Sequence, residues 1–115
     1  MDDDDVILVN IAEGLKRVMN NGKLYVRLLG KFKDDPSFKE VEAALEAEDM
    51  EKAKTSVHTL KGLAANLSLT ELFKQSLELE TQIKAGSVDS EQLTILKDVY
   101  AKTVTEVDKV VAQYV

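Results

Sequence analysis

The spacing of the apolar residues constrains the fold of this chain more than any other feature. Apolar side chains recur every three or four positions, as at Leu93, Leu96 and Tyr100, and no segment alternates apolar and polar residues as a half-buried strand does. Helices are predicted at about residues 10–20, 23–33, 38–47, 50–66, 69–85 and 90–114. With short connections, these helices predict an all-α fold, an antiparallel four-helix bundle with additional N-terminal helices.

Polar residues with capping ability stand at the predicted helix boundaries. Asn21 and Asp49 each precede a helix and can accept a hydrogen bond from one of its free amides, while Gly86 can end the helix before it. Four pairs have the spacing of a capping box, in which two side chains satisfy each other's backbone amides: Asn10 with Glu13, Ser37 with Glu40, Ser68 with Glu71, and Asp89 with Gln92.

The composition indicates one small soluble domain. The 115 residues are 44% hydrophobic and 31% charged, an ordinary globular balance, so we expect a single domain over residues 1–115 that acts as a monomer. Residues 1–5 are predicted to be a disordered acidic tail. No apolar run is long enough to span a membrane. The absence of cysteine excludes disulfides and thiolate metal sites and fits a cytoplasmic location.

Charge and motifs exclude several function classes. With 15 basic and 21 acidic residues the net charge is −6, which argues against nucleic-acid binding because phosphate contacts need clustered Lys and Arg. The acidic residues lack the spacing of a calcium loop, and no metal or cofactor is predicted. No glycine-rich phosphate-binding motif is present, so the chain is not expected to be an autonomous kinase.

His58 is the only histidine, and the helical pattern places it on the side that faces water. At about 100° per residue, the buried arc of its helix is formed by apolar residues, and His58 points roughly 150° from the middle of that arc. The predicted core positions of this helix are Ala53, Val57, Leu60, Leu63, Ala64 and Leu67. An exposed imidazole on such a face is a candidate for carrying a phosphoryl group.

The predicted neighbours of His58 form an open, positive patch. Lys54, Lys61, Gly62 and Ala65 lie within about 60° of it on the helical projection. A glycine inside a helix costs roughly 1 kcal/mol relative to alanine, and core packing does not require one on an exposed face. We therefore expect Gly62 to allow close access to His58. Alternatively, the lysines are ordinary surface charges and the histidine is structural.

The run His58-Thr59-Leu60-Lys61-Gly62-Leu63-Ala64-Ala65-Asn66-Leu67, followed by Leu72 and by Leu79-Glu80, resembles the histidine phosphotransfer (HPt) domain of two-component phosphorelays. One position departs from the family, which commonly has glycine where this chain has Ser68. We interpret Ser68 as a cap of the next helix. Glu80 falls on the apolar side of its helix and can pair with a basic residue that the sequence does not identify.

The resemblance implies that His58 accepts a phosphoryl group from a receiver-domain aspartate or a sensor or hybrid histidine kinase and passes it to a response-regulator aspartate. It implies Lys61 as the contact to the phosphoryl oxygens, and Lys54, Gly62 and Ala65 as docking residues for the receiver, which supplies Mg²⁺. Two alternatives stay open. The first is a non-phosphorylated helical adaptor, and the second is the phosphoacceptor module of a larger chemotaxis-type histidine kinase.

Overall fold

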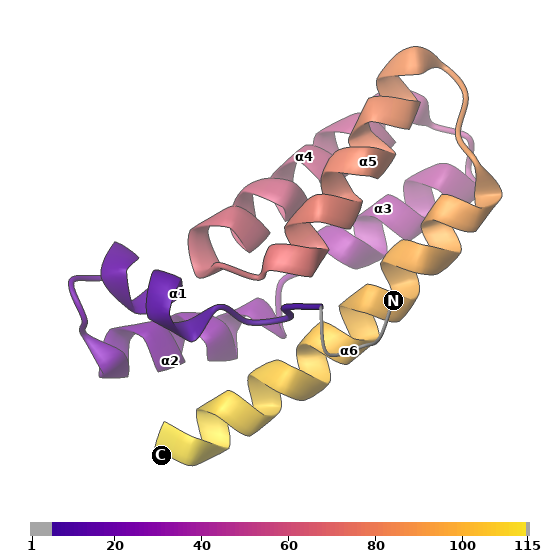
Figure 1. The fold of residues 1–115 in the computed structure, drawn as a ribbon. Coiled ribbons are helices and arrows are strands. Elements are labelled where there is room, and N and C mark those ends of the chain that lie inside the picture. Colours follow the sequence, from indigo (N-terminus) through magenta and orange to yellow (C-terminus); the bar gives the residue numbers. More distant parts are fainter. Residues whose placement is uncertain (1–5, 115) are drawn as a thin grey trace.

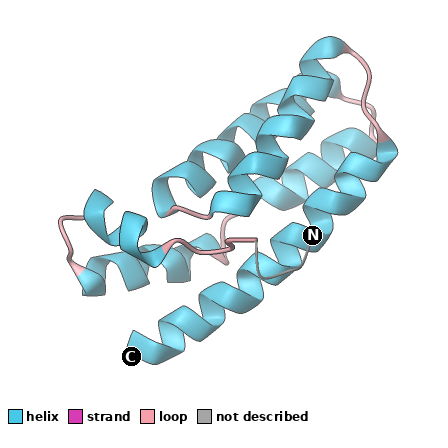
Figure 2. Ribbon diagram, viewed as in Figure 1, coloured by secondary structure: helices cyan, strands magenta, loops and turns pink. Residues whose placement is uncertain are grey.

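The computed structural model describes residues 6–114, and within them the chain forms six α-helices and no strand (Figure 2). The helices are α1 (Ile11–Arg17), α2 (Gly22–Phe32), α3 (Ser37–Glu46), α4 (Met50–Leu67), α5 (Thr70–Ala85) and α6 (Ser90–Tyr114). The all-α class is confirmed, and the boundaries lie close to the predicted ones. The acidic tail predicted at residues 1–5 lies outside the described residues.

Helices α3 to α6 form the predicted antiparallel four-helix bundle. α4 packs between α3 and α5, and the N-terminal part of α6 lies along α5 (Figure 1). α6 is the longest helix and continues beyond the bundle, where α2 packs against it. The short helix α1 contacts both α2 and α4. The additional N-terminal helices are therefore present, at the end of the bundle where α4 turns into α5.

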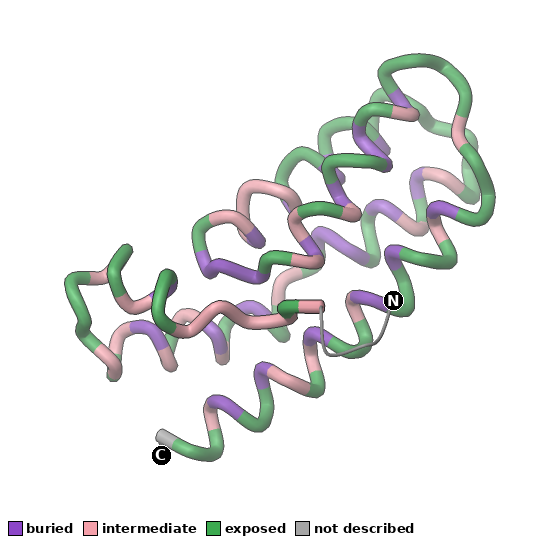
Figure 3. The backbone as a smooth tube through the Cα atoms, in the orientation of Figure 1, coloured by how far each residue is buried: buried purple, intermediate pink, exposed green. Residues whose placement is uncertain are grey.

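The apolar stripes predicted from the sequence are largely buried, and buried positions recur along each of the long helices (Figure 3). Burying one valine or leucine side chain stabilises the fold by about 1.5–3 kcal/mol, so the stripe fixes which side of each helix faces water. Of the core positions predicted on α4, Leu63 is half-buried, and the fully buried ones are Ala53, Val57, Leu60, Ala64 and Leu67. The opposite side of α4, which carries His58, is consequently left to the solvent.

Several predicted caps are present. Asn10, Asn21 and Asp49 each accept a hydrogen bond from the backbone amide three residues later, at 3.2, 3.1 and 3.1 Å. Gly86 ends α5 in the left-handed conformation, with φ of 78°. Asp89 departs from the prediction because its side chain accepts from the amide of Glu91, at 2.9 Å. These caps fix where α4 begins and where α5 ends.

The predicted capping boxes at Ser37 and Ser68 are wrong. Ser37 is the first residue of α3, and its amide donates to the side chain of Asp35 at 2.8 Å. Ser68 ends α4 in the left-handed region, with φ of 58°, and its hydroxyl donates to Glu13 at 3.0 Å. The tight turn into α5 demands a left-handed residue there, which explains why glycine would fit this position. The amide of Glu71 instead donates to a backbone carbonyl of the N-terminal segment.

That N-terminal segment and α2 together hold the turn between α4 and α5, the segment by two hydrogen bonds and α2 by one. The amide of Asn10 donates to the carbonyl of Ser68 at 2.9 Å, and the amide of Glu71 donates to the carbonyl of Ile7 at 3.0 Å. The buried hydroxyl of Tyr25 donates to the carbonyl of Leu67 at 2.8 Å. Burial raises the pKa of this hydroxyl to about 12, so it stays a donor at neutral pH. The end of α4 is thereby fixed against α1 and α2.

Replacing Gly14 with alanine should destabilise the protein, because α1 crosses α2 closely at this residue. A Cβ atom there would lie 2.3 Å from Cζ of Tyr25, whose ring is buried and whose hydroxyl is engaged. We expect Gly14→Ala to lower the free energy of unfolding by about 1–3 kcal/mol, as overpacking does. Urea denaturation measures the loss.

Gly30→Ala on α2 is the matched control. A Cβ atom at Gly30 meets nothing within 4 Å, and the alanine should therefore stabilise the helix by about 0.5–1 kcal/mol. If the two variants unfold at the same urea concentration, then the close crossing of α1 over α2 does not constrain the fold.

Candidate functional site

His58 lies in the middle of α4 and points away from the core. Its side chain is 69% exposed, although the preceding residue Val57 and the nearby Leu60 are buried. The placement follows from the helical period, because the buried stripe of α4 occupies the opposite side. The predicted exposure of the imidazole is confirmed.

Glu80 of α5 connects this imidazole to the body of the protein. Its side chain is only 3% exposed, and its two carboxylate oxygens have different partners. Oε2 lies 2.9 Å from Nδ1 of His58, and Oε1 accepts a hydrogen bond from Nζ of Lys61 at 2.7 Å. Nζ of Lys84, one helical turn further along α5, lies 3.9 Å from Oε1. One buried carboxylate thus holds three side chains together.

The carboxylate of Glu80 is ionised at neutral pH. Burial by itself would raise its pKa, but hydrogen bonds from Lys61 and His58, with the charges of Lys61 and Lys84, outweigh burial and leave the pKa below its usual value. An ionised carboxylate can only accept hydrogen bonds. His58 must therefore donate from Nδ1, which in the neutral ring leaves the lone pair on Nε2.

The surroundings of His58 form a shallow depression of about 320 Å³. It is lined by Lys54, Thr55, His58, Glu80 and Lys84. Two lysines thus flank the imidazole from α4 and α5. The chemistry that this arrangement offers is a nucleophilic nitrogen, held in one tautomer by a buried carboxylate, next to cations that attract an anionic group.

The predicted patch is only partly as expected. Lys54 is exposed and lines the depression. Lys61 is not the free surface cation that we expected, since its side chain is 21% exposed and bound to Glu80. Gly62 is half-buried and open, because a Cβ atom there would meet nothing within 4 Å. Ala65 is half-buried, two turns beyond His58, and is not part of the depression.

Sequence reasoning left the partner of Glu80 unidentified and missed Lys84 altogether. A carboxylate on the apolar side of a helix was the available signal, because buried acidic side chains are almost always paired. The position of Lys84, four residues after Glu80, was a second signal, since residues at that spacing are neighbours on a helix.

Comparison with known families identifies the fold. The family model described as the Hpt domain matches residues 35–110, more than half of the chain. The chain belongs to the Hpt domain family. Hpt domains are histidine phosphotransfer modules of phosphorelays, which work with kinase and receiver partners and are not autonomous kinases. No curated protein and no solved structure matches the chain in the corresponding comparisons.

The match to the Hpt domain covers α3, α4, α5 and most of α6, including His58, Lys61 and Glu80, and leaves α1 and α2 outside it. Among residues 6–114 of this Hpt domain, no group of three or more His, Asp or Glu side chains is arranged to hold a metal ion. No helix in the same part of the chain is both long and apolar enough to cross a membrane.

Proposed function

We propose that Nε2 of His58 is the phosphoacceptor of this Hpt domain. It would take the phosphoryl group from a receiver-domain aspartate or a sensor or hybrid kinase and pass it to a response-regulator aspartate. The observation that carries the proposal is the hydrogen bond of 2.9 Å between Nδ1 of His58 and the buried Glu80. This bond occupies Nδ1 and leaves the lone pair of the neutral ring on Nε2, in a side chain that is 69% exposed.

The transfer step follows from this geometry. The lone pair of Nε2 attacks the phosphorus of an aspartyl phosphate, a nitrogen–phosphorus bond forms, and the bond from phosphorus to the aspartate oxygen breaks. The aspartate leaves with the electron pair, and the imidazole ring gains positive charge. Glu80, which accepts from Nδ1 at 2.9 Å, stabilises that charge. The receiver would supply Mg²⁺ and the acidic pocket, and the return transfer reverses these steps.

Lys61 is proposed to hold the phosphoryl oxygens without leaving Glu80. Its ammonium group has three N–H donors, and the bond of 2.7 Å to Glu80 uses only one of them. In this proposal the remaining donors bind the anionic group carried on Nε2 of His58. Glu80 thus serves to position Lys61 for that contact.

The remaining residues of the patch are assigned to docking. Lys54 and Lys84 flank the depression beside His58 and would attract the acidic receiver pocket. Gly62 and Ala65 have no side chain beyond a methyl group, which lets the backbone of the receiver approach α4. Lys84 is thereby added to the docking residues expected from the sequence.

Incubation with a phosphorylated receiver domain tests the proposal. The expected product is phosphate on the Hpt domain that is labile in acid and stable in alkali, as a phosphorylated histidine is. An adaptor with an incidental histidine takes up no such phosphate. Whether the domain works alone or within a chemotaxis-type kinase is decided by the neighbouring sequence, since a kinase needs an ATP-binding domain.

Replacing Lys61 with alanine should slow transfer by roughly 10–100-fold, because a charge-assisted contact to the transferring group is worth about 1.5–3 kcal/mol. Because Lys61 is half-buried and bound to Glu80, its loss should also affect stability. Glu80 loses its shortest hydrogen bond, and we expect the free energy of unfolding to fall by about 1 kcal/mol. Rapid-quench transfer assays and urea denaturation measure the two effects. A rate within twofold of wild type would show that Lys61 only supports Glu80.

Replacing Gly62 with glutamine should move stability and function in opposite directions. The open space at this residue accommodates a side chain, and helix propensity favours glutamine by several tenths of a kcal/mol. The same side chain occupies the surface where the receiver must dock, so transfer slows. Melting temperature and transfer rate are measured on one preparation. A variant that melts higher and transfers at the wild-type rate would remove Gly62 from the docking surface.

A further inference from the structure

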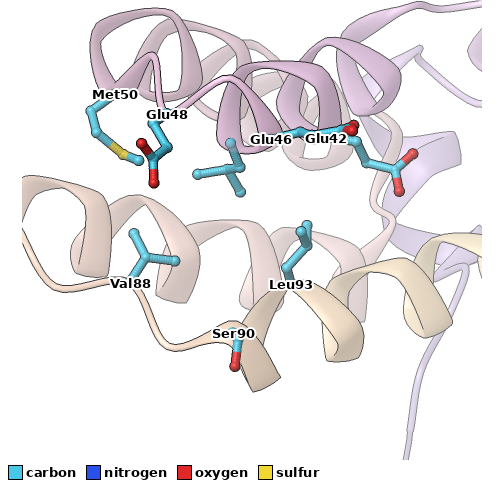
Figure 4. Close-up of a pocket in the computed structure, with 8 residues that line it drawn as sticks. Glu42, Glu46, Glu48, Met50, Val88, Ser90 and Leu93 are labelled. Carbon is cyan, nitrogen blue, oxygen red and sulfur yellow. The ribbon is translucent and has the colours of Figure 1, made fainter.

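A second concave surface lies away from His58, at the end of the bundle where α3 turns into α4 and α5 turns into α6. We call it the α3–α6 groove. Its volume is about 590 Å³, and it is lined by Glu42, Leu45, Glu46, Glu48, Met50, Val88, Ser90 and Leu93. In Figure 4, Glu48 of the α3–α4 turn and Met50, the first residue of α4, reach toward Val88 on the opposite wall. The groove and the depression at His58 have no lining residue in common.

The groove lies away from the aromatic contact between α3 and α6. The ring of Phe38, near the start of α3, stacks on Tyr100 of α6 with centroids 4.2 Å apart and planes 9° apart. Towards the end of α3 no comparable ring contact joins the two helices in the described residues. Leu45 and Leu93 are only half-buried there, and Met50 is 42% exposed. Apolar walls are therefore open to solvent at this end.

The rim of the groove on the α3 side is acidic. Glu42 has one distant partner, Lys97, whose nitrogen lies 3.9 Å away on an exposed side chain. Glu46 and Glu48 form no ion pair with any residue in the range 6–114. Glu48 also has a φ of 57°, a left-handed conformation that glycine would adopt more easily. A carboxylate is thus present at a turn position where the backbone favours glycine.

We propose that the α3–α6 groove binds a basic amphipathic helix of a partner protein. One or two large apolar side chains of that helix would enter between Leu45, Met50 and Leu93, at the spacing of three and four residues used in helix-in-groove recognition. Lysine or arginine residues on its flanks would face Glu46 and Glu48. The charge of the rim selects this occupant, because a second copy of this chain, with a net charge of −6, would be repelled.

A titration with two synthetic peptides tests the proposal on the full chain. The first is an amphipathic helical peptide with leucines at positions three and four apart and lysines on the flanks. The second has glutamate in place of every lysine. Amide resonances of the nitrogen-15-labelled protein are followed. We expect the lysine peptide to shift the resonances of Leu45, Met50, Val88 and Leu93, and the glutamate peptide to leave them unchanged.

Variants of the rim separate charge from fold. Glu46→Gln with Glu48→Gln should weaken binding of the lysine peptide about fivefold, the size expected for two exposed charge pairs. Glu40→Gln with Glu78→Gln removes the same charge from exposed positions outside the groove and should leave the affinity unchanged. Glu48→Gly should weaken binding while the melting temperature stays equal or rises, since glycine relieves the left-handed backbone.

Three results would overturn the proposal. The first is the absence of any resonance shift in the groove with millimolar lysine peptide. The second is equal binding of the two peptides, which would make the groove a purely apolar cleft. The third is concentration-dependent dimerisation through the same residues, which would make a second copy the occupant. None of these results depends on phosphorylation of His58, so the groove and the phosphotransfer site are tested separately.

Discussion

His58→Gln should abolish phosphorylation while leaving the fold intact. Glutamine has no nitrogen lone pair that can attack phosphorus, and the chain has no other histidine. Its amide can still donate a hydrogen bond to Glu80, which keeps the buried carboxylate partnered. Because the His58 side chain is 69% exposed, we expect the free energy of unfolding to change by less than about 0.5 kcal/mol.

The measurement is incorporation of phosphate from a phosphorylated receiver, followed by acid and alkali treatment, with circular dichroism on the same samples. Wild-type protein is the positive control. Stable phosphate on the His58→Gln variant would place the acceptor on another residue and refute the proposed function. Loss of the helical signal would instead show that the imidazole is structural.

Glu80→Ala should slow transfer by about 100-fold, at the upper end of the effects seen when a partner that orients a functional side chain is removed. Two causes act together. His58 loses the acceptor that keeps the proton on Nδ1, and Lys61 loses the group that positions it. We also expect the free energy of unfolding to fall by about 1–3 kcal/mol, because Lys61, 21% exposed, is left without its partner.

Glu80→Gln is the matched control, since glutamine keeps the size and one acceptor oxygen and removes the charge. It should retain more activity than Glu80→Ala, because its carbonyl can still accept from Nδ1 of His58. Equal rates for wild type, Glu80→Gln and Glu80→Ala would mean that the carboxylate contributes nothing to transfer.

The pH dependence of stability has a definite sign. The pKa of Glu80 is lower in the folded protein than usual, so its contribution is fully present above the ordinary carboxyl pKa. The contribution disappears as the pH falls through the lowered folded-state value. The difference in unfolding free energy between wild type and Glu80→Gln should therefore shrink on acidification.

The helices and the exposed face of His58 could be predicted because both follow from local spacing. Three- and four-residue intervals determine which side of α4 is buried, and Asn10, Asn21 and Asp49 cap as expected from their own sequence neighbourhoods. Helical spacing and N-caps both depend on residues that are only a few positions apart in the sequence. It is sufficient for the fold class and for the side of α4 that faces water.

The pairing around Glu80 could not be predicted, because it depends on the register between α4 and α5. A shift of α5 by one turn, about 5.4 Å, would have moved the carboxylate of Glu80 out of hydrogen-bond distance of His58 and Lys61. The capping box predicted at Ser68 was wrong for a related reason. Its left-handed backbone and its bond to Glu13 depend on a turn held by the N-terminal segment, which sequence spacing does not report.

The length of α6 affects which parts of the protein unfold together. The C-terminal part of α6 runs beyond the bundle along α2 (Figure 1). The second half of α6 carries the buried residues Val107 and Val110. Regions that share one buried interface tend to unfold as a cooperative unit. Amide hydrogen exchange in α2 and in the last turns of α6 should thus proceed with a common opening free energy, lower than that of α4. Local unfolding of α2 and the end of α6 would leave the amides of α4, the helix that carries His58, protected from exchange.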